Sequence, residues 1–269
     1  MRQRRARGDT VSYAFDADTR VEPLADGVLG AAITDRWNAL GERPNGGYLL
    51  GICLQALRRV LPFPDPLTVA AFFLRPARPG PAEVRTEVVR AGRRLASGEA
   101  RLLQEGAEVV RAVATFTELA AASGRTLVLA EPPDLPPPDE TVDVLGGQSI
   151  PGLSLVDRFE YRMAGRPGWA QGRPSGDPRV QLWLRFRDGL EVTAHVRARP
   201  ASGWLACRVS TRYVIGGYHE EDFEVWDSRS VGTKSRRRRA KRLSPPARRG
   251  HVRDHGPMDM SPGRRHREA

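Results

Sequence analysis

The run from Pro44 to Leu61 constrains the fold of this chain most, because a glycine-rich entry leads into a long apolar pattern. From Tyr48 onward the apolar residues recur with the 3.6-residue period of a helix, and only three polar residues interrupt them. The pattern predicts a helix over Tyr48–Leu61 that is buried around most of its circumference. A helix of this kind needs a sheet or other helices around it.

Asn45, Gly46 and Gly47 precede this helix and form the first candidate site. Asn45 is predicted to be the N-cap, whose side chain accepts a hydrogen bond from an unpaired backbone N–H. The two glycines leave room for a ligand or another backbone to approach the first turn. Free N–H groups and the helix dipole would favour an oxyanion or a polarised carbonyl there. The alternative is that Asn-Gly-Gly is only a tight turn before a core helix.

Strand patterns stand on both sides of this helix. Val11–Asp16 and Val28–Trp37 precede it, and a proline-rich run ends it at residues 62–66. Four more strands are predicted over Leu67–Leu74, Ala82–Ala91, Leu95–Gln104 and Val109–Leu119. The first of these four is nearly all apolar, like a central strand, and the short turns between the others predict an antiparallel meander. The order predicts an α+β hotdog, in which an antiparallel sheet wraps around one central helix.

The second half of the chain partly repeats the first. Arg199-Pro200 follows Arg75-Pro76 at an offset of 124 residues, and each pair lies between two predicted strands, as in a duplicated domain. The strands predicted in this half are Leu155–Arg162, Val180–Phe186, Glu191–Arg199, Trp204–Tyr213 and Tyr218–Asp227. Residues 186–191 join two of them almost directly, which leaves no room for a four-turn helix. We therefore expect a double hotdog whose second repeat lacks its central helix.

Composition shifts along the chain indicate its domain organisation. We expect residues 1–10 to be disordered, 11–119 to be the N-terminal hotdog domain, 120–153 a Pro-rich linker, 154–228 an incomplete C-terminal hotdog-like domain, and 229–269 a disordered basic tail. The tail holds 14 Lys+Arg against 3 Asp+Glu, which accounts for the whole net charge of +11. Nucleic-acid binding is therefore expected only through the tail. Because the pattern changes abruptly after Ser228, where a last strand is due, one hypothesis is that the tail comes from a shifted reading frame.

Several classes of protein are excluded by what the sequence lacks. No apolar run of about 18 residues is present, so no membrane span is expected, and no apolar signal region follows the basic N-terminus. Cys53 and Cys207 have neither disulfide-framework nor metal-site spacing, and no serine lies in a GxSxG elbow. We expect a cytoplasmic protein with no metal and no cofactor.

The order and spacing of several short motifs resemble the acyl-CoA thioesterase II-like (TesB-like) double-hotdog family. The motifs are Pro44–Leu49, Phe72–Gly80, Arg90–Leu95, Ala112–Phe116, His195–Leu205 and Gly216–Asp222. The resemblance implies hydrolysis of a fatty acyl-CoA by water, to free acid and CoA, in lipid metabolism. The Asp, Thr and Gln of the family pattern have no counterpart here, so the alternative is an inactive hotdog protein that binds acyl groups or partners, with a nucleic-acid-binding tail. Hotdog sheets commonly pair along an edge, so a homo-oligomer is a further expectation.

The resemblance also suggests which other side chains contact the acyl-CoA substrate. Tyr48, Phe73 and Arg75 are the expected substrate contacts, beside the carbonyl donors at the start of the helix. His219 and Glu220 follow a Gly-Gly pair and could serve as a general base or line the CoA entrance. The alternative for these two residues is a solvated hairpin turn before a strand.

Overall fold

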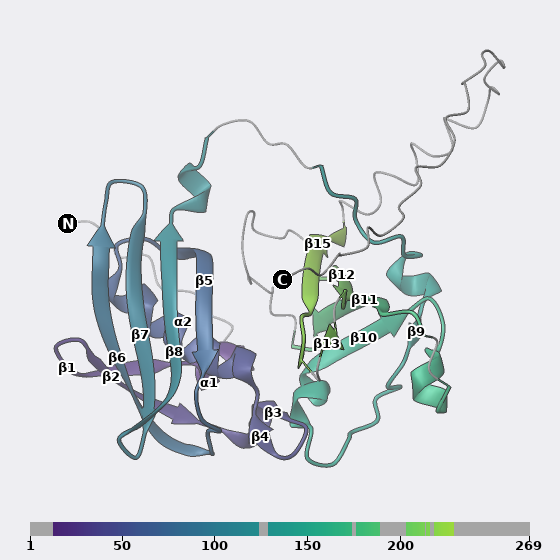
Figure 1. Ribbon diagram of the computed structural model, residues 1–269, viewed down its shortest axis with the longest axis horizontal. Coiled ribbons are helices and arrows are strands. Elements are labelled where there is room, and N and C mark those ends of the chain that lie inside the picture. The colour runs from purple at the N-terminus through teal and green to yellow at the C-terminus, as the bar shows by residue number, and fades with distance from the viewer. Residues whose placement is uncertain are drawn as a thin grey trace, which may run out of the picture.

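The computed structural model describes residues 13–123, 129–173, 176–188, 203–212, 214–215 and 218–228 (Figure 1). The predictions made for residues 1–10, Glu191–Arg199 and 229–269 lie outside these ranges and stay predictions. None of the helices in the described ranges is long and apolar enough to span a membrane.

The first half forms a six-stranded antiparallel sheet in the order β1-β2-β6-β7-β8-β5. Its strands are β1 (Val21–Ala25), β2 (Val28–Ile33), β5 (Asp65–Phe73), β6 (Gly80–Ala91), β7 (Ala96–Gln104) and β8 (Ala107–Thr117). Gly27 and Gly106 adopt positive φ angles of 68° and 77° in the turns after β1 and β7, which glycine does without strain. The predicted meander of three strands is confirmed as β6-β7-β8.

The central position predicted for Leu67–Leu74 is wrong, because β5 lies at the edge of the sheet and pairs only with β8. Both sides of β6 and β7 are already paired within the sheet, so β5 has no central position and pairs with the outer side of β8. Phe72, Phe73 and Leu74 are consequently 58%, 55% and 50% exposed. The apolar residues at the end of β5 therefore form exposed surface at this edge. The nearly all-apolar sequence of this strand predicts burial on both faces instead.

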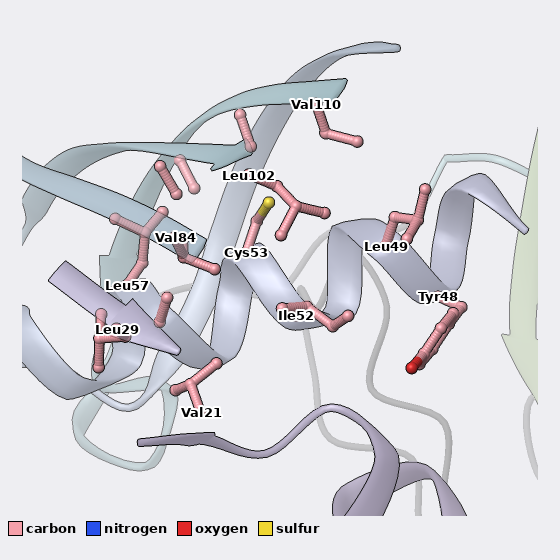
Figure 2. Packing of buried hydrophobic residues seen from close by; sticks show 14 of the residues in the cluster. Val21, Leu29, Tyr48, Leu49, Ile52, Cys53, Leu57, Val84, Leu102 and Val110 are labelled. Carbon is pink, nitrogen blue, oxygen red and sulfur yellow. The ribbon is translucent and has the colours of Figure 1, made fainter. Parts of the chain in front are cut away.

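The predicted central helix is confirmed as α2 (Gly46–Val60), which begins two residues before Tyr48. It packs against β6, β7 and β8, and the sheet lies along its length (Figure 1). In Figure 2, Leu49 and Cys53 point toward Leu102 and Val110 on the sheet, whereas Tyr48 points to the opposite side of the helix. Because Ile52, Cys53, Ala56 and Leu57 are all fully buried, this helix fills the main core.

Two segments before α2 differ from the strands predicted there. The stretch predicted as a strand at Val11–Asp16 contains instead the short helix α1 (Ala14–Asp18). Phe15 of α1 packs on α2 at Gly51, where a Cβ would lie 2.7 Å from the Phe15 ring, so tertiary packing decides this local structure. The strand predicted over Val28–Trp37 ends at Ile33, and the chain continues through η1 (Asp35–Trp37) and the short pair β3 (Asn38–Ala39) and β4 (Arg43–Pro44).

The second half forms a five-stranded antiparallel sheet in the order β15-β12-β11-β10-β9. Its strands are β9 (Val142–Asp143), β10 (Phe159–Met163), β11 (Arg179–Phe186), β12 (Leu205–Ser210) and β15 (Asp222–Asp227), with the small hairpin β13 (Val214–Ile215) and β14 (Tyr218–His219). Short 3-10 helices connect these elements: η2 (Leu119–Ala121), η3 (Pro138–Glu140), η4 (Ser154–Arg158) and η5 (Gly168–Gln171). The strand predicted over Leu155–Arg162 therefore starts only at Phe159.

The two sheets repeat one topology, since β10-β11-β12-β15 corresponds in order and direction to β1-β2-β6-β7. The connection from β2 to β6 has 46 residues (34–79), whereas that from β11 to β12 has only 18 (187–204). The first connection contains α2 and β5, which alone require 15 and 9 residues. Eighteen residues cannot hold both, so the second repeat lacks room for a copy of the central helix and the strand after it.

The second half has only a small core of its own. Its buried residues are Met163, Leu182, Leu205 and Cys207. Val225 pairs with Cys207 and Phe223 pairs with Val209, yet Val225 and Phe223 are 40% and 56% exposed. The apolar face of the second sheet is therefore only partly covered.

We expect Ile52→Ala to destabilise the protein by about 2–5 kcal/mol, because Ile52 is fully buried in α2 and the truncation leaves a cavity. Urea unfolding followed by circular dichroism measures this change. Arg58→Ala, on the exposed side of the same helix, is the control and should change stability by less than about 0.5 kcal/mol. Equal effects of the two substitutions would mean that α2 is not the core helix.

Candidate active site

The first turn of α2 has the geometry predicted from the sequence. Oδ1 of Asn45 accepts hydrogen bonds from the backbone N–H groups of Gly47 and Tyr48, at 2.8 and 3.4 Å, which confirms Asn45 as the N-cap. The Gly46 amide, at the first helical position, has no acceptor within the helix. Gly47 is exposed and Gly46 is half-buried, so this positive end of the helix dipole is open to solvent.

Phe73 of β5 lies directly against this turn. A Cβ added at Gly46 would be 2.9 Å from Cε1 of the Phe73 ring, so the ring packs on the bare glycine backbone. Phe73 pairs with the buried Val110 and therefore projects from the same face of the sheet as α2, whereas its neighbour Phe72 projects from the opposite face. Phe73 remains 55% exposed and forms an apolar wall beside the helix terminus.

Tyr48 lies deeper in the structure than a substrate contact at the surface would. Its side chain is 2% exposed, and burial raises the pKa of its hydroxyl. The backbone N–H of Thr34 donates to this hydroxyl at 3.1 Å, and the hydroxyl donates to the carbonyl oxygen of Asp18 at 3.0 Å. The observed hydrogen bonds connect α2 to the preceding segments, and substrate contact by Tyr48 stays a prediction.

An aromatic cluster places the first turn of α2 where the two halves of the chain meet. We call Phe15, Trp37, Tyr48, Phe159 and Phe186 the aromatic junction. The Trp37 ring stacks on Tyr48 with centroids 5.9 Å apart and contacts Phe186 of β11 edge-on at 6.2 Å. The rings of Phe159 and Phe186 are 4.3 Å apart.

Asp18 fixes the orientation of Trp37 within this junction. Its buried carboxylate accepts a hydrogen bond from Nε1 of Trp37 at 2.8 Å and forms an ion pair with Arg36. The guanidinium of Arg158, from the second half, lies 5.6 Å from the Trp37 ring centroid. Sequence reasoning missed these residues, because they are scattered along the chain and share no period or motif.

Arg75 follows β5 and carries a positive charge near the same edge of the sheet. Its Nη1 donates to the carbonyl oxygen of Glu108 at 2.8 Å. The neighbouring Glu108 carboxylate has a lowered pKa, mainly because Arg111 donates hydrogen bonds to it, with weaker contributions from the charges of Arg101 and Arg75. Arg111 therefore binds this carboxylate directly, and Arg101 and Arg75 add positive charge near it.

The other predicted pair lies in the second half. The backbone of His219 pairs with Val214 in the small β13–β14 hairpin. The exposed carboxylate of Glu220 lies 3.6 Å from the Arg212 guanidinium, which also pairs with Asp222 at 2.6 Å. Arg212 thus balances the charge of Glu220, and a catalytic role for His219 and Glu220 stays a prediction.

Neither cysteine is suited to act as a nucleophile. Burial raises the pKa of the Cys53 thiol to about 12, and it does the same for Cys207. Both thiols are therefore protonated near neutral pH, whereas the thiolate is the reactive form.

The comparisons with known proteins agree with the resemblance read from the motifs. Residues 33–117 match the family model of the acyl-CoA thioesterase N-terminal domain. A candidate thioesterase II from Thermobifida fusca YX has a similar structure, with a TM-score of 0.68, 24% identity, and coverage of 80% of this chain and 94% of that one. The acyl-CoA thioesterase II TesB2 from Mycobacterium marinum gives a TM-score of 0.60 at 17% identity, over 80% of this chain and 92% of that one. These findings confirm the predicted α+β double-hotdog fold and the likeness to TesB-like thioesterases.

The chain is also similar to a relative that has no assigned function. An uncharacterized protein of Mycobacterium tuberculosis is 26% identical over 253 residues, covering 74% of this chain and 86% of the relative. Because 74% of 269 residues is about 199, about 54 of the 253 aligned positions have no residue in this chain. The relative therefore contains sequence that this chain lacks.

We expect Tyr48→Phe to destabilise the protein by about 1–3 kcal/mol, because the partly buried Thr34 N–H loses its acceptor and the buried hydroxyl no longer donates to the carbonyl oxygen of Asp18. Urea unfolding measures the change, and Tyr13→Phe, at a partly exposed position, is the control. An unchanged stability for Tyr48→Phe, together with weakened substrate binding, would contradict the structural role and favour the predicted substrate contact.

The native protein should react with Ellman's reagent at pH 8 at least about tenfold more slowly than the protein unfolded in urea. The reason is that both thiols are buried and have pKa values of about 12. The absorbance of released thionitrobenzoate reports the rate. Rapid modification of one thiol in the native state would show that this thiol is accessible and ionised.

Proposed function

We propose that this chain, whose residues 33–117 carry an acyl-CoA thioesterase N-terminal domain, acts on fatty acyl-CoA thioesters at the first turn of α2. The observation that carries the proposal is the open, Asn45-capped glycine turn with the Phe73 ring packed beside it. Its position at the junction of the two halves, next to Trp37 and Tyr48, places it beside a large apolar core.

The chemistry of this turn suits a thioester carbonyl. When water attacks the carbonyl carbon, negative charge develops on the carbonyl oxygen, and N–H groups at a helix N-terminus stabilise that charge. Gly46 contributes a backbone N–H there, and Gly47 has no side chain that would block the approach. The C–S bond then breaks, and the departing CoA sulfur takes up a proton as the free acid forms.

The two ends of an acyl-CoA would meet different surfaces. Phe73 offers apolar contact to the first methylenes of the acyl chain, since it is half exposed and lies against Gly46. Arg75 is two residues further along the chain and could pair with a phosphate of CoA. The two substrate contacts proposed here therefore come from one edge of the sheet.

A second candidate is binding of acyl-CoA without turnover. The observation in its favour is the connection of 18 residues between β11 and β12, which is too short to hold copies of both the central helix, where the family pattern has its Asp, and the strand after it. In this case the helix terminus would still hold the thioester carbonyl, but no carboxylate from a second central helix would activate water.

Release of free thiol from acyl-CoAs of several chain lengths, in the presence of Ellman's reagent, tests the first candidate. We expect Phe73→Ala to raise KM by roughly tenfold, since about 1.4 kcal/mol of apolar contact corresponds to that factor. Phe72→Ala, the adjacent and equally exposed ring on the opposite face, should leave KM within about twofold.

Equilibrium dialysis of radiolabelled acyl-CoA separates the two candidates. Binding that Phe73→Ala weakens, without thiol release, would establish the non-hydrolytic protein. Absence of both binding and turnover over all chain lengths would contradict both candidates.

A further inference from the structure

The proline-rich segment predicted as a linker is bound to the second half over part of its length. We call residues 131–141 the proline strap; its residues 131–137 form neither helix nor strand, and η3 follows them. Pro133 is fully buried, whereas Asp134 and Pro137 are exposed. The proline strap therefore lies with one edge against the protein and its other edges in solvent.

The proline strap has the sequence pattern of a polyproline II helix, which has three residues per turn and no internal hydrogen bonds. Pro133 and Pro136 are one turn apart, in a Pro-x-x-Pro motif, and so lie on the same edge of such a helix. Pro137 adopts φ −52° and ψ 149°, close to polyproline II geometry. Because proline has no backbone N–H, residues 136–138 offer only carbonyl oxygens for hydrogen bonding.

The second sheet supplies the donors that these carbonyl oxygens need. Nε1 of Trp183 donates to the carbonyl oxygen of Pro136 at 2.7 Å. Nε of Arg162 donates to the carbonyl oxygen of Pro138 at 2.8 Å, and Nη2 of the same side chain donates to the carbonyl oxygen of Thr141. An indole N–H and a guanidinium donate hydrogen bonds and accept none, so the sheet and the proline strap are complementary.

The donors of Arg162 are held in place by charged groups of the same half. Nη1 of Arg162 lies 3.1 Å from Oε1 of Glu160, whose side chain is only 13% exposed. Glu160 also binds Arg185 at 2.6 Å, and the Arg185 guanidinium lies 4.3 Å from the centroid of the Trp204 ring. The surface that binds the proline strap is therefore organised by residues outside the strap.

Trp183 projects from the face of the second sheet that is turned away from its core. Leu182, the preceding residue, belongs to that core, and side chains alternate between the two faces along a strand. Trp183 is 2% exposed, and its cross-strand partner Ala206 is fully buried. On the outer face of the first sheet, by contrast, the paired side chains of Arg101 and Arg111 are 41% and 42% exposed. The outer face of the second sheet is thus covered where that of the first sheet is open to solvent.

We propose that the outer face of the second sheet, at Trp183 and Arg162, is a binding site for proline-rich segments in the polyproline II conformation, and that the proline strap is its ligand in cis. A polyproline II helix is formed before it binds, so an aromatic surface with N–H donors binds it at low entropic cost. A tethered segment acts at an effective concentration on the order of millimolar, so the strap excludes other ligands while it is bound. When the strap is released, a proline-rich segment of another protein takes its place. None of these residues belongs to the proposed thioester site, so the binding site does not depend on the proposed function.

Fluorescence anisotropy of a labelled peptide with the sequence of residues 131–141 tests the proposal on the full chain. The double variant Pro133→Ala/Pro136→Ala, which we call the strap variant, loosens the strap because alanine lacks the ring and the fixed φ of proline. The strap variant should bind the peptide at least about tenfold more tightly than the unmodified chain, since its own strap competes less. A peptide that carries the same two alanines should bind at least about tenfold more weakly than the proline peptide.

Substitutions of the two donors, made in the strap variant, show whether the peptide binds at this surface. Trp183→Phe removes the indole N–H, Arg162→Met removes the guanidinium donors, and each should weaken peptide binding by about fivefold or more. Arg111→Met is the matched control, because it removes an arginine from the outer face of the first sheet, and it should leave peptide binding unchanged.

Hydrogen exchange at the indole N–H of Trp183, followed by NMR, reports on the strap in the unmodified chain. The signal is assigned by its loss in Trp183→Phe. It should exchange at least about a hundredfold more slowly than in the chain unfolded in urea, because this N–H is buried and hydrogen-bonded. In the strap variant the exchange should be at least about tenfold faster than in the unmodified chain.

Four results would overturn the proposal. They are no peptide binding by the folded strap variant up to about 1 mM, equal binding of the proline and alanine peptides, binding that neither donor substitution weakens, and an indole N–H of Trp183 that exchanges as fast as in the unfolded chain. Thermal unfolding of every variant confirms that binding is measured on folded protein. If the strap variant is unfolded, Pro136→Ala, which keeps the buried ring of Pro133, replaces it in every titration.

Discussion

The burial of α2 is the interaction on which the rest of this structure depends. Its sheet-facing side fills the concave face of the first sheet, and its opposite side carries Tyr48, which joins the aromatic junction. Glycines on both sides allow this close approach: Gly51 accommodates Phe15, and Gly98 of β7 accommodates Leu57, whose Cδ2 would lie 2.9 Å from an added Cβ. One helix therefore joins the core of the first sheet to the aromatic cluster that contacts the second half.

The sequence predicts an element best where the residues of that element alone form a recognisable pattern. The helical period of residues 48–61, the N-cap at Asn45 and the β6-β7-β8 meander are local, and all three are confirmed. The order of helix and strands, with the partial repeat in the second half, predicted the double-hotdog fold, and the motif resemblance to TesB-like proteins agreed with it.

What the sequence could not predict depends on contacts between distant residues. An alternating pattern near Phe15 resembled a strand, but the ring is needed against Gly51, and the chain is helical there. The apolar run of β5 resembled a central strand because composition does not show which edges of a sheet are already paired. At the candidate site, the sequence predicted the capped glycine turn, whose geometry is observed, whereas the roles of this turn and of Phe73 stay predictions. The contacts of Asp18, Trp37 and Phe186 have no motif.

The shortened connection between β11 and β12 has a consequence for how this molecule holds together. Among the described residues, the second sheet has a core of only four buried side chains, and Phe186, with Phe159 and Leu155 beside it, is buried in the core of the first half. The folding of the second half is therefore coupled to the folding of the first half. The two halves should unfold as one cooperative unit. Selection that preserves the second half must then also act on residues of the first half that touch no substrate.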